Sequence, residues 1–267
     1  MQSLKRVRLA MMKMMSERPL LTIAYSTLPS RIKSITYPSP QEDREVLVLV
    51  QNQDESSYVF NERSAKLIEL KNRGVAKSRN AALDRASGKY LLFGDDDITF
   101  DEAGIRSALA YFESHPSCSI ILARAIDETG KSRKNYVSKE TPLKLTNSAR
   151  AATYEMLIRV DSIREKQIRF DEIFGAGTTN YLGDEYIFIA DALRAGLSGV
   201  HLPVNFAVHP TESSGSRWGT EEDLRARRKV FTRVFGWKAP IYRAGFLFKS
   251  KNPAPGFSKT LRFIFGR

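Results

Sequence analysis

Residues 74–97 read GVAKSRNAALDRASGKYLLFGDDD and decide the fold. A glycine opens an amphipathic helical run, a Ser-Gly turn follows, and the apolar run 90–93 predicts a buried strand. Asp95, Asp96 and Asp97 come at the end of that strand. Carboxylates this close repel one another unless a cation or a hydrogen-bonding ligand lies between them. The stretch therefore predicts a helix, a strand and a site where a divalent metal holds a phosphate.

Strand and helix signals alternate on both sides of this stretch. We expect helices from about residue 75 and over 101–114, and strands over 20–26, 46–50, 66–70, 90–93 and 119–123. Strands separated by helices of this length predict a mostly parallel sheet flanked by helices. Ligands bind such sheets beyond the carboxyl ends of the strands, where the three aspartates lie.

The second half of the chain is less regular. Residues 125–152 are rich in Lys, Ser, Thr and Asn and predict a surface excursion. A strand is expected near 154–160. Gly183-Asp184-Glu185 opens a helix that runs to about Arg194, and strands over 200–208 lead to His209. These segments complete an α/β fold.

The charges are unevenly distributed along the chain. The net charge of +12 over 267 residues divides into +4 for residues 1–18, −2 for 19–216 and +10 for 217–267. A body that is almost neutral argues against a nucleic-acid-binding core, so no nucleic-acid partner is expected. We therefore predict a basic amphipathic segment, a folded body and a basic aromatic extension with these boundaries.

Cysteine content and hydropathy bear on the compartment. Cys118 is the single cysteine, which excludes an internal disulfide and cysteine-rich zinc sites. No stretch approaches the ~18–20 apolar residues needed to cross a bilayer. The expectation is a cytoplasmic protein.

The motifs resemble glycosyltransferase family 2, which is built on the GT-A fold. The matching segments are 74–83, 86–93, Asp95 to Asp97, 170–175, 183–185 and His209-Pro210. The resemblance covers roughly residues 20–215 and implies a Rossmann-like catalytic domain over 19–216. It implies transfer of a sugar from a nucleotide-diphosphate donor, with a UDP-sugar favoured, to a glycan or lipid-linked acceptor.

The resemblance also implies roles for the acidic cluster. Asp97 matches the aspartate that binds Mn²⁺ or Mg²⁺, and Asp95 matches the one that reaches the ribose or a metal-bound water. A hard cation on oxygen ligands stabilises the negative charge of the departing diphosphate. Asp96 is expected to point away and to be structural. His209 lies where the family often has a histidine that closes the metal site.

Further residues match positions that bind the donor. Arg79 corresponds to an arginine near the diphosphate or bracing the aspartates. Lys77 would add a second positive group, or would lie on a solvated helix face. At the exits of the first two strands, nucleotide-binding positions correspond to Ser26, Thr27, Arg31 and Asp54. The segment 51–54 lacks the family's aspartate-rich turn, which leaves the choice of nucleotide open.

The acidic pair that opens the later helix resembles the family's catalytic base. A carboxylate there takes the proton of an acceptor hydroxyl as the hydroxyl attacks the anomeric carbon, which inverts its configuration. Glu185 occupies the position usually held by the catalytic aspartate, and Asp184 remains a second candidate. The alternative is that both charges merely complement the helix dipole.

The extension combines positive charge with ten aromatic residues. Basic clusters attract anionic headgroups at about 1 kcal/mol per Lys or Arg near the surface, and aromatic rings settle at the interface. The aromatic residues include Trp218, Trp237, Phe246, Phe248, Phe263 and Phe265. We expect peripheral attachment to the inner face of an anionic membrane. The alternative is that the rings pack on the body.

Two other functions fit parts of the sequence. A non-catalytic membrane- or RNA-binding module would use the extension without needing the carboxylates. A sugar-nucleotide pyrophosphorylase would need an amino-terminal glycine-rich loop, and residues 19–35 contain no glycine. A metal-dependent, inverting glycosyltransferase is the interpretation that uses all the motifs.

Overall fold

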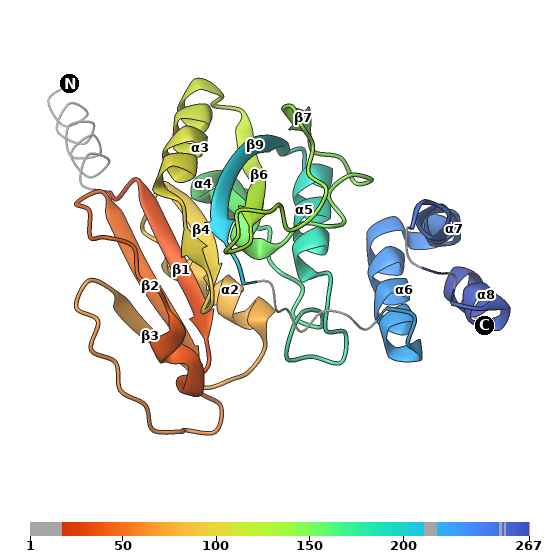
Figure 1. Cartoon of the computed structure of the whole chain (residues 1–267), viewed down its shortest axis with the longest axis horizontal. Helices are drawn as coiled ribbons and strands as arrows, with labels where there is room; N and C mark the ends of the chain where they lie inside the picture. Colours follow the sequence, from red (N-terminus) through yellow and green to blue (C-terminus); the bar gives the residue numbers. More distant parts are fainter. Residues whose placement is uncertain (1–17, 211–217, 251–252, 254, 267) are drawn as a thin grey trace, which may run out of the picture.

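The computed structural model describes residues 18–210, 218–250, 253 and 255–266. Apart from Arg18, the predicted amphipathic segment 1–18 lies outside these residues. A central sheet, drawn from red to cyan in Figure 1, carries helices on both faces, and three further helices project to one side. The predicted α/β architecture, with a mostly parallel sheet flanked by helices, is confirmed.

The sheet has the strand order β3-β2-β1-β4-β8-β6-β9-β5, with β7 paired to β9. Its first half is parallel and consists of β1, β2, β3 and β4. Strand β8 pairs antiparallel with β4 and β6, whereas β6 and β9 run parallel. The strands are β1 (Leu21–Thr27), β2 (Arg44–Gln51), β3 (Lys66–Leu70), β4 (Tyr90–Asp95), β5 (Thr99–Phe100), β6 (Cys118–Ile126), β7 (Thr141–Pro142), β8 (Met156–Arg159) and β9 (Ser198–Val208).

Helices are interspersed among the strands through the body of the chain. They are α2 (Val75–Arg85), α3 (Glu102–Ser114), α4 (Val160–Glu165), α5 (Asp184–Arg194), α6 (Glu221–Phe235), α7 (Ala239–Lys249) and α8 (Phe257–Phe265). Short 3-10 turns are η1 (Pro29–Ser34), η2 (Thr153–Glu155) and η3 (Gly236–Lys238). The expected helices within the body are therefore present.

Two apolar layers cover the two faces of the sheet. Side chains of α3 pack on one face, and those of α2, α4 and α5 pack on the other. Strand β2 contributes Val46, Val48 and Val50 to the first layer and Leu47 and Leu49 to the second. A strand covered on both faces needs apolar residues at every position, which explains the continuous run in the sequence.

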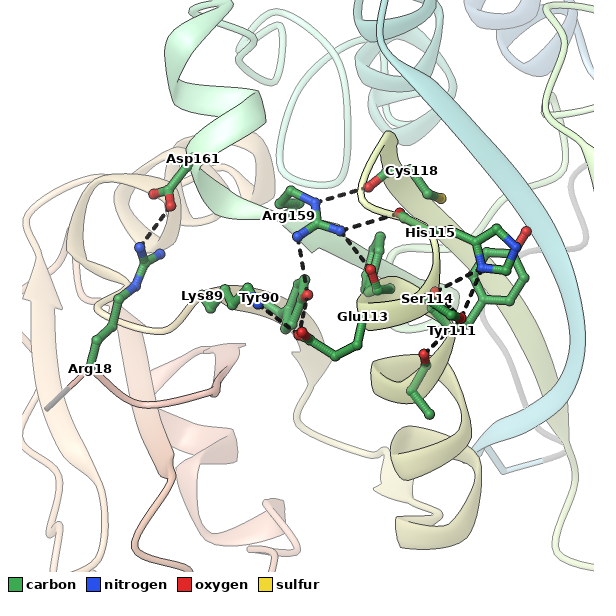
Figure 2. Close-up of polar contacts among 12 residues, drawn as sticks. Arg18, Lys89, Tyr90, Tyr111, Glu113, Ser114, His115, Cys118, Arg159 and Asp161 are labelled. Atoms are coloured by element: carbon green, nitrogen blue, oxygen red, sulfur yellow. Dashed lines mark hydrogen bonds and ion pairs between the residues drawn. The ribbon is translucent and has the colours of Figure 1, made fainter. Parts of the chain in front are cut away.

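The amino end of β4 is held by a network around Arg159 (Figure 2). Tyr90 and Phe112 stack with ring centroids 4.6 Å apart, and the Arg159 guanidinium lies 5.2 Å and 5.1 Å from the two centroids. It donates hydrogen bonds to the carbonyls of Phe112 and Cys118. The network joins β4, β8 and α3 at the end of the sheet opposite the aspartates, so its role is structural.

Candidate active site

The carboxyl ends of β1 and β4 lie side by side and carry the first group of predicted site residues. The parallel register places Ser26 opposite Asp95. The Ser26 hydroxyl is 2.8 Å from the Ser78 hydroxyl, which connects the end of β1 with α2. The sheet topology therefore brings together residues that lie about fifty to seventy positions apart in the sequence.

Asp96 lies directly after β4 and is buried. It is 7% exposed, and it accepts a 2.7 Å hydrogen bond from the Thr27 hydroxyl. Arg31 lies 2.5 Å from Asp96 and 3.2 Å from Asp97. Thr27, itself buried, and Arg31 were predicted to contact the nucleotide. In the structure both are engaged with the aspartates.

Asp95 and Asp97 remain partly open to solvent, with side-chain exposures of 37% and 36%. Burial raises the pKa of Asp95, the Arg79 guanidinium opposes this shift, and the carboxylate of Asp97 adds to it. A carboxylate that is hard to ionise beside another one indicates a local excess of negative charge. The two partly exposed groups supply the hard oxygen ligands that Mg²⁺ and Mn²⁺ prefer.

Arg79 connects the aspartates to the second acidic pair. It projects from α2, is 4% exposed, and forms ion pairs with Asp184 and, at 3.2 Å, with Glu185. Its other terminal nitrogen lies 3.6 Å from Asp95. One guanidinium thus contacts Asp95, which was predicted to bind the metal or the donor. It also contacts the Asp184–Glu185 pair, which was predicted to accept the proton.

Two glycines let α5 begin against this arginine. Gly183 has φ +90° immediately before Asp184. Gly175 has φ +96°, and a Cβ added to it would lie 2.8 Å from the Asp184 carboxyl carbon. Side chains other than hydrogen are strained at positive φ and would not fit this approach. The glycines therefore hold the acidic start of α5 close to α2.

Asp184 and Glu185 have different surroundings. The Asp184 side chain is 3% exposed, and that of Glu185 is 19% exposed. Burial and the adjacent Glu185 carboxylate raise the pKa of Asp184 to about 7. Burial also acts on Glu185, but Arg79 and a 2.9 Å hydrogen bond from the Thr153 hydroxyl outweigh it and hold the pKa of Glu185 below its ordinary value. Glu185 is therefore the more accessible carboxylate and the one that is ionised at neutral pH.

His209 follows β9 at the edge of the site. Continuing the antiparallel register of β5 with β9 places it opposite Ile98, the residue after Asp97. Its Nδ1 lies 2.7 Å from the Pro210 carbonyl oxygen. If Nδ1 donates to that carbonyl, Nε2 is left as an acceptor, the form in which an imidazole binds a metal. Within the described ranges, no group of three or more His, Cys, Asp or Glu side chains is already assembled as a metal site.

Two predicted residues lie at the margin. Lys77 is half-buried in the first turn of α2, two residues before Arg79. Asp54 is exposed in the loop after β2, beyond the buried Asn52, whose amide oxygen accepts a hydrogen bond from the Ser56 N–H. The structure brings neither side chain into the Arg79 cluster, and their contact with a donor stays a prediction.

Sequence reasoning missed two residues at the start of η2. Thr153 donates to Glu185, and the Tyr154 ring lies 5.0 Å from the His209 ring. The Asp95 carboxylate contributes to the raised pKa of Tyr154, whose main cause is burial. Neither residue belongs to a motif. They reach the site because β8 runs back between β4 and β6, a pairing without a local sequence signal.

A family comparison covers the part of this site that precedes α5. The sequence model of glycosyl transferase family 2 matches residues 24–179, more than half of the chain. The chain belongs to glycosyltransferase family 2. The match includes Arg79 and the three aspartates, so the predicted family and enzyme class are confirmed. A search among curated proteins finds no match.

Solved structures of S. aureus TarS show a similar fold. TarS has 14% sequence identity, a TM-score of 0.55, and an alignment over 81% of this chain and 40% of TarS. The TarS 1-349 structures in complex with UDP and with UDP-GlcNAc each have 13% identity and a TM-score of 0.55. They align over 91% of this chain and over 69% and 70% of their own chains. At this identity the similarity establishes the GT-A fold, and this chain spans less than half of the whole TarS chain.

Proposed function

We propose that this family 2 protein is a metal-dependent, inverting glycosyltransferase that uses a nucleotide-diphosphate sugar, with a UDP-sugar favoured. The observation that carries the proposal is the position of Arg79 between Asp95 and the Asp184–Glu185 pair. Arg79 therefore holds a donor-binding carboxylate close to a proton-accepting carboxylate. The TarS 1-349 complexes with UDP and with UDP-GlcNAc support the class of donor.

Glu185 is the proposed base. Its carboxylate takes the proton of an acceptor hydroxyl while that oxygen forms a bond to the anomeric carbon. The bond from this carbon to the diphosphate oxygen breaks on the opposite face, and the nucleoside diphosphate leaves with the electron pair. Asp184, which is less exposed and in direct contact with Arg79, positions the arginine that keeps Glu185 ionised.

Asp95 and Asp97 are the proposed ligands of Mn²⁺ or Mg²⁺, and His209 is a third candidate. A magnesium ion is commonly held by one or two carboxylates together with the substrate's phosphates. Two protein carboxylates are therefore a sufficient set when a diphosphate is present. The ion, when bound, would neutralise charge on the departing diphosphate. Arg31, which already contacts Asp97, lies where it would add a second positive group.

The acceptor we propose is a glycan or a lipid-linked glycan precursor, with the enzyme working as a peripheral protein on an anionic membrane. Six of the nine large apolar side chains exposed in the described part of the chain lie in the C-terminal helices, which supports this location. In the described residues, no helix combines the length and apolarity required to span a bilayer.

The test uses Glu185→Gln with Glu165→Gln as the matched control, since Glu165 lies at the exposed end of α4. General base catalysis contributes about 10²- to 10⁴-fold, so we expect Glu185→Gln to lose that much in kcat. Donor binding, measured as Mn²⁺-dependent thermal stabilisation by UDP-GlcNAc, should remain. Full activity of Glu185→Gln would refute the assignment of the base. Loss of donor binding as well as activity would show that Glu185 acts on the donor instead.

A further inference from the structure

The extension after residue 217 folds into a three-helix unit with its own core. Leu224, Phe231, Ala239 and Phe263 form its buried centre. The guanidinium of Arg243 donates to the carbonyls of Arg228 on α6 and Ile264 on α8, which links the three helices. The unit is therefore a fixed scaffold, and the directions of its surface side chains are set by its packing.

Helix α6 attaches this unit to the catalytic body. Arg233 forms ion pairs with Asp171 at 2.9 Å and with Asp191 at 2.7 Å. Tyr181 donates a 2.9 Å hydrogen bond to Asp223. Helices α7 and α8 pack on α6 and lie farther from the sheet, at the side where the chain ends in Figure 1. Their outer surfaces therefore do not face the body.

The aromatic residues divide into an inner and an outer set. Phe246 packs against Phe231 and Phe263, with centroids 5.3 Å and 6.2 Å away, and Trp218 packs on Phe246. For Phe263, which is 2% exposed, the expectation of a surface role was wrong because it belongs to the unit's core, and the partly buried Phe246 packs against that core. The outer set, here called the C-terminal apolar surface, consists of Trp237 (82% exposed), Ile241 (69%), Phe248 (92%), Phe257 (82%), Leu261 (42%) and Phe265 (63%).

Helical spacing collects these side chains into two rows. Trp237, Ile241 and Phe248 follow one another at intervals of four and seven residues along η3 and α7. On α8, Phe257, Leu261 and Phe265 are spaced by four. Residues at these intervals lie on one side of a helix. Each outer helix thus exposes an apolar stripe where a surface helix would ordinarily have polar residues.

Positive charge predominates beside these rows, and Glu221, which pairs with Arg262 at 3.1 Å, is an acidic side chain at the edge of the α8 row. From Leu224 to Arg267 the sequence contains twelve Lys or Arg and no Asp or Glu. The Lys238 ammonium lies 5.2 Å from the centre of the Trp237 ring. Lys249 directly follows Phe248, and Lys259 lies between Phe257 and Leu261 in sequence. Rings and lysines alternate on the same segments of the chain.

We propose that the C-terminal apolar surface docks on a bilayer that contains anionic phospholipid. The rings would enter the boundary between headgroups and acyl chains, and the neighbouring lysines would contact lipid phosphates. A second copy of the chain is disfavoured as the occupant, because a self-complementary contact would place lysines mainly against lysines, and Glu221 at the edge of the surface is already paired with Arg262. The proposal deepens the proposed function, since it names the surface through which a lipid-linked acceptor is approached.

The test measures flotation of the full chain with vesicles of phosphatidylcholine alone or mixed with phosphatidylglycerol. Wild type should float with the mixed vesicles only. Replacing the two exposed lysines, as Lys238→Gln and Lys249→Gln, should weaken binding about 25-fold, from about fivefold for each charge removed. Trp237→Ser with Phe248→Ser should weaken it by at least about tenfold. Val59→Ser is the control, because Val59 is 60% exposed on a loop of the body.

Tryptophan fluorescence gives a second readout at the surface itself. In a Trp218→Phe background, Trp237 is the remaining tryptophan and its emission should shift to the blue when mixed vesicles are added. Absence of both flotation and shift in wild type overturns the proposal. So does binding that the ring and lysine variants leave unchanged. Self-association that the ring variants abolish, without vesicle binding, overturns it in favour of a second copy.

An assay of donor hydrolysis in solution distinguishes failure of the docking surface from failure of the enzymatic proposal. Hydrolysis of UDP-GlcNAc needs no vesicle, and the surface variants should retain it at the wild-type rate. Vesicle binding without hydrolysis counts against the enzymatic proposal alone. Hydrolysis without vesicle binding counts against the docking surface alone.

Discussion

Replacing Arg79 with methionine removes the one cation shared by the two acidic groups of the site. Methionine has a similar length and carries no charge, so Asp184 and Glu185 lose their ion pairs while the volume of the side chain is largely kept. Arg79 is 4% exposed and Asp184 is 2% exposed. Removing one partner of a buried ion pair costs about 3–5 kcal/mol, because the remaining charge is left without compensation. We expect a loss of that size in the free energy of unfolding at pH 7.

The same substitution should change the pH dependence of catalysis. Arg79 holds the pKa of Glu185 below its ordinary value against the effect of burial. Without the guanidinium, the effect of burial dominates and raises the pKa of Glu185, so that a smaller fraction of the proposed base is ionised at neutral pH. The acid limb of the kcat/KM profile should move to higher pH, and kcat/KM at pH 7 should fall by at least about a hundredfold.

Arg159→Met is the matched control for this experiment. Arg159 is also partly buried, but it contacts carbonyl groups and the Tyr90 hydroxyl at the opposite end of the sheet (Figure 2). Its loss should lower the free energy of unfolding by about 1.5–3 kcal/mol and leave the acid limb where it is. Urea unfolding and pH–rate profiles measure both effects. An unchanged acid limb in Arg79→Met, or an unfolding loss below that of Arg159→Met, would refute the reasoning.

Two further predictions concern Asp184 and its surroundings. The pKa of Asp184 is raised to about 7 in the folded protein, so between about pH 4 and 7 the folded state binds more protons than the unfolded state. The free energy of unfolding should therefore fall as the pH rises through this window, and less so in Asp184→Asn, as urea titrations at several pH values will show. Gly175→Ala, whose Cβ would meet Asp184, should lose about 1–3 kcal/mol more than Gly130→Ala, where φ is also positive and nothing lies within 4 Å of the added Cβ. Equal losses in the two glycine variants would mean that the close approach to Asp184 has no energetic consequence.

The sequence predicted the parallel half of the sheet because the evidence for it is local. The continuous apolar run in β2 and the glycine-led helix before β4 identify buried strands joined by a crossover. A strand near 154–160 was expected, but the antiparallel pairing of β8 has no local signal, and neither do the two-residue strands β5 and β7. Their pairing depends on the path of residues 125–155, which is fixed by tertiary contacts.

The candidate site, like the sheet, was predictable where its residues belong to a local motif. Motif positions identified Arg79, the aspartates and the acidic start of α5, and the fold brings them together. Thr153 and Tyr154 were missed because they belong to no motif. In the extension, composition alone gave the right residue types but did not separate core rings from exposed ones, since that division follows from how three helices pack.

The central claim is that Asp95 and Asp97 bind a nucleotide-diphosphate sugar together with a divalent cation. Isothermal titration of UDP-GlcNAc into the protein, with Mn²⁺ present or removed by a chelator, tests it most directly. We predict binding that requires Mn²⁺ and is lost in Asp95→Asn and Asp97→Asn, but kept in Glu185→Gln. Donor binding of equal affinity with and without the cation, or in wild type and both aspartate variants, would contradict the account.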